Sequence, residues 1–256
     1  MKLNNKGFAI STIMYMILIM AVLLITITLT LLSSRKLVLD KTKQETLENI
    51  YSKLPSQYQE VEHIESTGTQ YIDTGIIPNQ YTGFDIIFLT KNSLISTPSG
   101  TISGYGSVMG ARQASSNKEF QLTTYSATGG NYFGTLRYNN TSNNAGITPN
   151  VKMHVTLLNK VYTDNNGAKT TLSGTFTAPV TLTVFALNNN GTITQHGIVQ
   201  LYSLKLYNES TMIRNFIPCY RKSDGEIGLY DTIENKFYSN EGTEKFMKGN
   251  DIKYNK

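Results

Sequence analysis

The hydrophobic pattern begins with an unbroken apolar segment near the N-terminus. Residues 8–32, FAISTIMYMILIMAVLLITITLTLL, include no charged residue. A helix of this length measures about 37 Å, enough to cross the ~30 Å hydrocarbon core of a bilayer with some tilt. A secretory signal has a shorter apolar region, about 7–15 residues, and small residues at its cleavage site. Here Leu31 and Leu32 precede Ser33, so the pattern predicts a retained transmembrane helix, with a removed signal or a buried core helix as alternatives.

The helical pattern continues beyond the apolar segment. Residues 33–53 include no Gly or Pro, and Pro55 follows them. On a polar background of good helix formers, apolar residues make a loose stripe, and Pro55 is expected to end it. We therefore predict one helix of about 45 residues, roughly 70 Å long by its rise, whose second half is amphipathic. The stripe consists of Leu37, Val38, Leu47, Ile50, Tyr51 and Leu54.

From Pro55 onward, short runs of Val, Ile, Thr, Tyr and Phe alternate with clusters of Gly, Asn, Asp and Ser, a pattern typical of strands and turns. Segments 164–167 and 188–191 carry Asn-Gly hairpin signals, and turns are expected at Gly225 and Gly228. The pattern predicts an all-β sandwich of about 200 residues, residues 54–250, with a short tail at 251–256. The candidate strands are residues 58–65, 71–74, 84–90, 107–111, 119–125, 132–138, 152–159, 169–173, 180–186, 197–207, 212–220, 227–231 and 236–238.

Charge and composition narrow the function. The net charge is +5 over 256 residues, but the first 53 residues hold seven basic against three acidic side chains. The excess of positive charge therefore flanks the apolar segment, and the pattern does not indicate a nucleic-acid-binding surface, which clusters basic residues on the folded domain. The lone cysteine, Cys219, excludes an internal disulfide framework and is interpreted as a small packed hydrophobe.

The N-terminus resembles that of a type IV prepilin. The matching residues are Lys6, Gly7 and Phe8, after a short lysine-containing leader at 1–7 and before the apolar helix at 8–32. The resemblance implies that a membrane peptidase cuts after Gly7, that Phe8 is then methylated, and that the helix assembles with other pilin subunits. Thr12 departs from the family, which usually carries Glu at this position. A plain single-span anchor without processing is the alternative.

Two indications of membrane orientation disagree. Lys2 and Lys6 lie before the apolar segment, whereas Arg35, Lys36, Lys41 and Lys43 follow it. The positive-inside rule would place the C-terminal side in the cytoplasm. The prepilin resemblance implies the opposite, and a β domain poor in charge suits the exterior. We therefore expect a single-pass protein of the cell membrane with an extracellular β domain.

Two stretches of the β region carry a second resemblance. LPSQYQEVEHIESTGTQYIDTGI (54–76) and IRNFIPCYRKSDGEIGLYDTIENKFYSNEGTEKF (213–246) are similar to the ends of a concanavalin A-like, laminin-G-like jelly-roll module found in Gram-positive surface and phage proteins. The resemblance implies a jelly roll whose first and last strands pair. It implies no general ligand.

Candidate chemistry is sparse. Glu60 and Glu62, at i and i+2 of one predicted strand, would share a face, as the two carboxylates of a glycosidase require. The interpretation that we favour is a solvated strand face, with a membrane-tethered glycoside hydrolase as the alternative. We expect no catalytic residue and no cofactor. We also expect no metal site, because the three histidines lack ligand spacing. The histidines are His63, His154 and His196.

Turn and recognition residues complete the expectations. Asp164 and Asp224 are interpreted as turn residues, with Ca²⁺ ligation as the alternative. Sixteen tyrosines include candidates for contacts with a glycan or a surface protein, because exposed Tyr side chains stack on sugars and anchor protein interfaces. The sequence thus predicts a non-enzymatic, membrane-anchored, pilin-like surface protein that presents a lectin-like β-sandwich for binding or adhesion.

Overall fold

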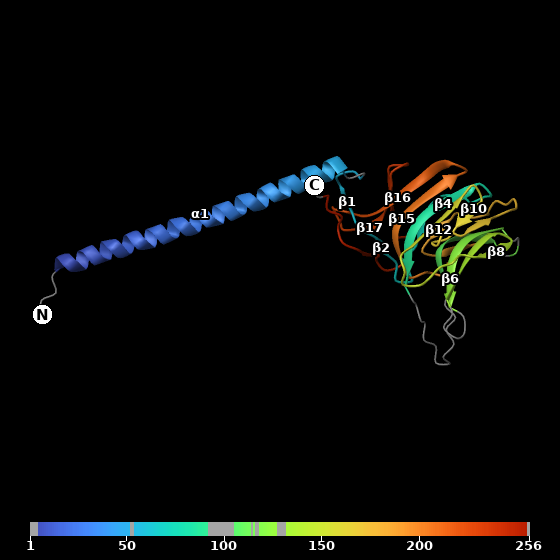
Figure 1. The fold of residues 1–256 in the computed structure, drawn as a ribbon, viewed down its shortest axis with the longest axis horizontal. Helices are drawn as coiled ribbons and strands as arrows, with labels where there is room; N and C mark the ends of the chain where they lie inside the picture. The colour runs from blue at the N-terminus through green and yellow to red at the C-terminus, as the bar shows by residue number, and fades with distance from the viewer. Residues whose placement is uncertain are drawn as a thin grey trace, which may run out of the picture. The chain divides into compact units, whose positions relative to one another are not determined.

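One long helix precedes the β structure. The computed structural model describes residues 5–51, 54–91, 105–113, 115, 118–126 and 132–254, and it describes side chains at 12–43, 54–91, 106–113, 115, 118–124 and 134–254. Helix α1, Asn5–Tyr51, is 47 residues long and is drawn in blue in Figure 1. The chain divides into two units, with the β structure in the unit Lys53–Ile252. The expectation of one continuous helix followed by an all-β region is confirmed.

The apolar part of α1 is long enough to cross a membrane. Within Thr12–Lys43 an 18-residue window has a mean hydropathy of 2.6, and every side chain at 12–43 is exposed. Thr28 and Thr30 each donate a 2.8 Å hydrogen bond to the backbone oxygen four residues earlier, which satisfies the hydroxyls inside an apolar environment. A helix of this length and composition suits a membrane anchor or a signal sequence.

The predicted amphipathic stripe is described only in part. Leu37 and Val38 are exposed, and the side chains of Leu47, Ile50 and Tyr51 lie outside the described residues. Leu54 does not belong to the helix. It is buried in the β unit beside Cys219 and Tyr230, because α1 ends at Tyr51.

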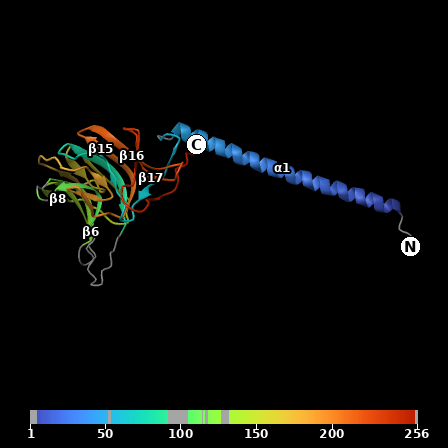
Figure 2. The same cartoon turned by 180° about the vertical axis from the view of Figure 1, so that it is seen from behind.

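The β unit is a sandwich of two sheets (Figures 1 and 2). The first sheet has the order β11-β10-β9-β4-β15-β16-β17-β18, with β1, β2 and β19 joined to it, and the second has the order β14-β13-β5-β6-β7-β8, with β12 and β3 joined. The strands of the first sheet are β1 Tyr58–Glu60, β2 Ile64–Glu65, β4 Thr82–Thr90, β9 Met153–Leu158, β10 Val161–Thr163, β11 Lys169–Thr171, β15 Val199–Asn208, β16 Thr211–Arg221, β17 Ile227–Asp231, β18 Lys236–Ser239 and β19 Met247–Lys248. Those of the second are β3 Ile72–Asp73, β5 Tyr105–Gln113, β6 Lys118–Ser126, β7 Tyr132–Asn139, β8 Thr141–Asn144, β12 Thr183–Val184, β13 Leu187–Asn189 and β14 Thr192–Thr194.

The connections have the character of a jelly roll. The chain passes between the sheets after β2, β3, β4, β8, β11 and β14, so that neighbours within a sheet come from distant parts of the sequence. The strand pairs are antiparallel apart from β13 with β5. The expected pairing of the first strand with the last occurs in a shifted form: the second strand, β2, pairs with the last strand, β19, and the first strand, β1, pairs with β16.

Every segment predicted as a strand contains at least one strand, but some of the predicted turns and strands differ from the structure. The hairpin signal at 188–191 joins β13 to β14 through Asn190 and Gly191, whose φ angles are +55° and +88°, as a type I′ turn requires. The turn expected at Gly228 is wrong, since this glycine lies inside β17. Strands β8, β10, β13, β14 and β19 were not predicted.

The core lies between the two sheets and is rich in aromatic rings. Phe84 of β4 meets Phe120 of β6 edge-to-face, with 6.1 Å between ring centroids, so the contact joins the sheets. The buried tyrosine hydroxyls are satisfied: Tyr138 donates to the oxygen of Gln80 at 2.8 Å, and Tyr162 donates to that of Ala145 at 2.6 Å. Burial raises the pKa of Tyr138 to about 12, so this hydroxyl remains a donor at neutral pH.

A smaller cluster contains the lone cysteine. Cys219 is fully buried with Leu54 and Tyr230, and burial raises the pKa of its thiol to about 12. The side chain therefore packs as a small apolar group, as the sequence indicated.

Candidate functional site

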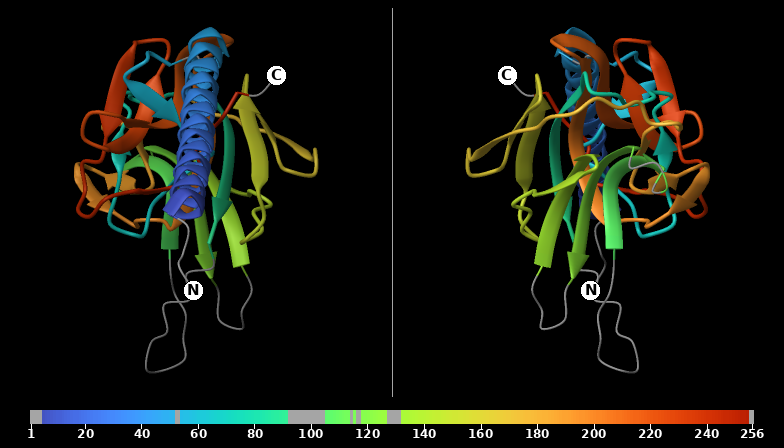
Figure 3. Two further views of the ribbon diagram at one scale, coloured as in Figure 1. Left: turned by 90° about the vertical axis from the view of Figure 1, so that its left-hand side faces the viewer. Right: turned by 90° about the vertical axis from the view of Figure 1, so that its right-hand side faces the viewer.

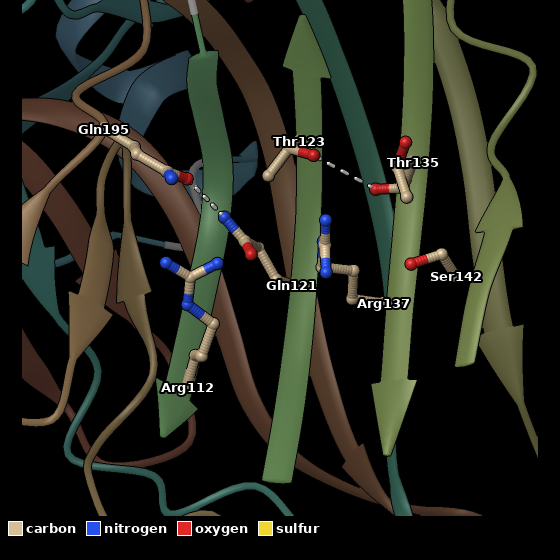
Figure 4. Close-up of a pocket in the computed structure, with 7 residues that line it drawn as sticks. All are labelled: Arg112, Gln121, Thr123, Thr135, Arg137, Ser142 and Gln195. Carbon is tan, nitrogen blue, oxygen red and sulfur yellow. Dashed lines mark hydrogen bonds between the residues drawn. The ribbon is translucent and has the colours of Figure 1, made fainter. Parts of the chain in front are cut away.

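A polar groove lies over the second sheet. It has a volume of about 370 Å³, and Figure 4 shows its lining side chains on neighbouring strands. The green strands β5, β6 and β7, which carry most of them, run side by side (Figure 3). The lining residues are Arg112 of β5, Gln121 and Thr123 of β6, Thr135 and Arg137 of β7, Ser142 of β8, and Gln195 after β14.

The alternation of β6 places its polar residues on this face. Phe120 and Leu122 are fully buried in the core, so residues 119, 121 and 123 point to the other side of the sheet. Antiparallel register then sets Gln121 opposite Arg137, and Arg137 opposite Ser142. The same register sets Thr123 opposite Thr135, so the groove floor is built by cross-strand pairs.

Gln121 occupies the middle of the groove and has an unused acceptor. Its side-chain nitrogen donates to Ser107 Oγ and to Gln195 Oε1, both at 2.8 Å. Its own Oε1 is buried and has no hydrogen-bond partner among the described residues, and the residue is only 1% exposed. A buried acceptor without a partner costs about 1–3 kcal/mol, and such groups call for an explanation in a native structure.

The surroundings hold Gln121 in one position. Gln195 has a φ of +50°, and its backbone oxygen accepts a 2.8 Å bond from the N–H of Ser107. On the other side, the absence of a side chain at Gly110 provides the space that the Gln121 side chain occupies. A Cβ at Gly110 would lie 2.9 Å from Gln121 Cγ and 2.7 Å from Leu187 Cδ1. The unused oxygen is therefore preorganised rather than free to turn away.

Two arginines supply the charge of the groove. Arg137 pairs with Glu119 at 3.2 Å, and that carboxylate is 11% exposed. The hydrogen bond of Arg112 is a long one, 3.4 Å from its Nε to the neutral Asn189 Oδ1. Figure 4 shows the two guanidinium groups on either side of Gln121. Among the seven lining residues there is no carboxylate.

A second hollow, of about 520 Å³, differs in that its charged groups contact one another. It is lined in part by Asp73, Arg214 and Glu234. Arg214 pairs with Glu234 at 2.6 Å, and Asp73 accepts a 2.5 Å bond from Thr181 Oγ1. Most of its lining residues come from the two stretches that carry the jelly-roll resemblance, 54–76 and 213–246.

The residues predicted from the sequence do not gather at the groove. Gly7 and Phe8 fall within the α1 backbone, and their side chains, like the first four residues of the leader, lie outside the described part. Glu60 is half-buried in β1, and Glu62 is exposed at a bend just after it. Glu62 accepts hydrogen bonds from the backbone and side chain of Asn250, at 3.3 and 3.2 Å.

The candidate turn residues make protein contacts. Asp164 accepts two 2.9 Å bonds from the backbone N–H groups of residues 166 and 168, and Asp224 accepts bonds of 3.0 and 2.7 Å from Arg221. Among the described residues, no group of three His, Cys, Asp or Glu side chains is placed to hold a metal ion. His154 contacts Asp85 at 2.9 Å.

The groove was not predicted from the sequence. Its residues come from four strands and one loop, so no local motif connects them. The signal that was present is the alternation EFQLT at 119–123, which predicts a polar outer face but not that the polar residues are enclosed.

Comparisons with known proteins give remote likenesses. No model of a known protein family matches the chain, and no curated protein matches it. A native heptameric SAP-like pentraxin from Limulus polyphemus is similar at 10% identity over 75% of this chain and 94% of that chain, with a TM-score of 0.45. The full-length tailspike protein 2 from Escherichia coli O157:H7 bacteriophage CAB120 is similar at 10% identity over 64% of this chain and 28% of its own, with a TM-score of 0.34. The fold therefore rests on the strand order and register described above.

Proposed function

We propose that the protein is a non-enzymatic, membrane-anchored binding protein, held by α1, whose sandwich binds a hydroxyl-rich ligand such as a glycan outside the cell. The observation that carries the proposal is the groove with its buried, unpartnered Gln121 Oε1. A ligand hydroxyl would satisfy that oxygen, and a site built to hydrogen-bond a hydroxyl discriminates strongly against ligands without one.

The other lining groups suit the same ligand. Thr123, Thr135 and Ser142 bring hydroxyls, which both donate and accept hydrogen bonds. Because the groups lie on paired strands rather than on a loop, their spacing is fixed before binding.

Filling the groove tests the proposal. Full-length protein in lipid nanodiscs is exposed to a panel of neutral and acidic oligosaccharides, and binding is measured together with recovery of the probes. Ser142→Tyr, at an exposed position of the groove wall, is expected to abolish binding by occupying the volume. Thr141→Tyr, at the exposed neighbouring position outside the groove, is the matched control and should bind normally.

Three results would contradict the proposal. The first is the absence of binding across the panel, and the second is binding that survives Ser142→Tyr. The third is cleavage of the probes that Glu60→Gln or Glu62→Gln abolishes, which would support the hydrolase alternative instead.

We further propose that the chain is processed between Gly7 and Phe8 and serves as a minor, pilin-like subunit. The features in favour are the Lys6-Gly7-Phe8 step and the uninterrupted helix that continues from it to Tyr51. Partners would then include a prepilin peptidase and other pilin subunits in the bilayer.

Processing predicts a defined mass change. The intact mass of membrane-extracted protein is expected to lack residues 1–7 and to include a methyl group on Phe8. Gly7→Asp is expected to preserve the full-length chain, whereas Asn5→Asp, which adds the same charge two residues earlier, should still be cut. A mature chain that begins at Met1 would leave the plain anchor as the remaining hypothesis. Protease treatment of intact cells reports the side on which the β unit lies.

A further inference from the structure

We infer that the groove selects an acidic polyol: a ligand that carries a carboxylate or phosphate next to hydroxyl groups. The inference rests on the proposed function and specifies its ligand class. Hydroxyls alone would satisfy Gln121, but they would leave Arg112 without a counter-charge of its own, because Glu119 pairs with Arg137.

The charges of the groove do not cancel. Glu119, which is 8% exposed as a residue, pairs with Arg137 at 3.2 Å. It is one carboxylate beside two guanidinium groups, since cross-strand register also sets it opposite Arg112. Among the described residues Arg112 forms no ion pair, and its side chain contacts the neutral Asn189 at 3.4 Å. The groove therefore keeps one positive charge for a ligand.

The geometry places that charge next to the unused acceptor. Arg112 and Arg137 come from β5 and β7, which flank β6 on its two sides, so the two strands lie about 10 Å apart at ordinary strand spacing. Gln121 of β6 lies between them (Figure 4). An anion held by either guanidinium would thus lie next to Gln121, the residue in the middle of the groove.

The two kinds of groups impose opposite requirements. The guanidinium groups only donate hydrogen bonds, and they match planar carboxylate or phosphate oxygens. Gln121 Oε1 only accepts. A simple anion would satisfy the first and a neutral sugar the second, whereas an acidic sugar or a polyol phosphate satisfies both.

Matched ligands separate charge from shape. Full-length protein in nanodiscs of neutral lipid is titrated with an oligogalacturonate, with its carboxyl-reduced neutral form, and with a glycerol phosphate oligomer. The wild type is expected to bind at least one acidic probe about tenfold or more tightly than the neutral sugar, as the loss of a charge-assisted hydrogen bond implies. That preference should shrink with added salt. The two acidic probes show whether carboxylate or phosphate is the better match.

Substitution of Arg112 assigns the preference to the groove. Arg112→Gln is expected to reduce the acidic-to-neutral ratio by about tenfold, and Arg112→Lys, which keeps the charge, should retain part of it. Lys118→Gln removes the same charge from an exposed position of β6 outside the lining, and it should leave the ratio unchanged. Thermal unfolding of each variant confirms that it is folded.

The failures of the inference and of the proposed function are distinguishable. Equal binding of acidic and neutral probes, or a preference that Arg112→Gln and Lys118→Gln reduce alike, overturns the inference. If Ser142→Tyr still abolishes that binding, the proposed function stands. Binding of no probe, or binding indifferent to Ser142→Tyr, overturns both.

Discussion

Replacing Asp231 with alanine is expected to lower the free energy of unfolding of the β unit by about 3–5 kcal/mol, the usual cost of breaking a buried ionic network. Asp231 ends β17 and is fully buried. Its carboxylate accepts backbone N–H bonds from Asn215 at 2.8 Å, Ile233 at 3.0 Å and Glu234 at 3.3 Å. It also lies 3.5 Å from Arg214 Nε.

The size of the expected effect follows from the groups that would lose the Asp231 carboxylate as a partner. Alanine would remove the acceptor of three backbone N–H groups. It would also leave Arg214, whose side chain is 12% exposed, with Glu234 as its one carboxylate partner among the described residues. Denaturant unfolding of full-length protein, followed by far-UV circular dichroism, measures the change. Asp224→Ala removes an equally charged turn residue that pairs with Arg221 at the surface, and it is expected to have little effect. Equal midpoints for the two variants would contradict the assignment of Asp231 as a structural node.

Gly228→Ala is expected to destabilise the β17–β18 hairpin by about 3 kcal/mol, at the upper end of the usual cost of overpacking. A Cβ on Gly228 would lie 2.2 Å from the backbone oxygen of Tyr238 and 2.8 Å from Phe237 Cζ. A ring can shift, but the backbone oxygen cannot move without disrupting the ladder that pairs Gly228 with Ser239. The same unfolding measurement gives the value.

Gly225→Ala separates space from backbone conformation. Gly225 has a φ of +71°, and a Cβ added to it would lie within 4 Å of no described heavy atom. Alanine at this position is therefore expected to cost only the backbone strain of a positive φ, about 1–2 kcal/mol of stability. Gly228 has the close contact without the positive φ. If Gly225→Ala proves the more damaging of the two, the close approach at Gly228 does not limit stability.

These two glycines show how far the sequence could predict the fold. Turn chemistry is local, so the turn at Gly225 and the Asn190-Gly191 hairpin were predictable from neighbouring residues. Gly228 is required by the close approach of Tyr238, which lies ten residues later in the chain, and such a requirement appears only when the register is known. The polar strand TSNN at 141–144 was missed for a related reason: pairing with β7, not its own propensity, makes it a strand.

Pro218 is a further case of a residue explained by its partners. Proline is unusual inside a paired strand, yet Pro218 lies inside β16. Strand β16 pairs with β15 as far as Phe216 and with β1 from Cys219 onward. Pro218 therefore sits where one edge of the strand changes partners, so its missing N–H breaks no ladder bond on that side.

The candidate site was less predictable than the fold. The apolar helix and the alternating strands follow from which residues avoid water, and that pattern can be read directly from the sequence. The groove depends on the enclosure of Gln121 by Gln195, which is 74 residues away in the sequence, and by Arg137 on the neighbouring strand, which is 16 residues away. A sequence shows a glutamine on a polar face; only the fold shows that its oxygen has no partner among the described residues.

The pairing of the two ends of the β unit determines how it would respond to mechanical force. If the bilayer holds α1 while a bound surface holds the sandwich, tension enters through β1. All three residues of that strand pair with β16. The backbone oxygen of Glu60 also accepts a 2.9 Å hydrogen bond from the N–H of Ile252, the last residue of the unit. A pull on the helix must therefore break the strand pairing and the C-terminal closure before the core can open. Because forced unfolding is governed by the unfolding rate, changes to these terminal pairings would alter the load at which the β unit opens under such a pull.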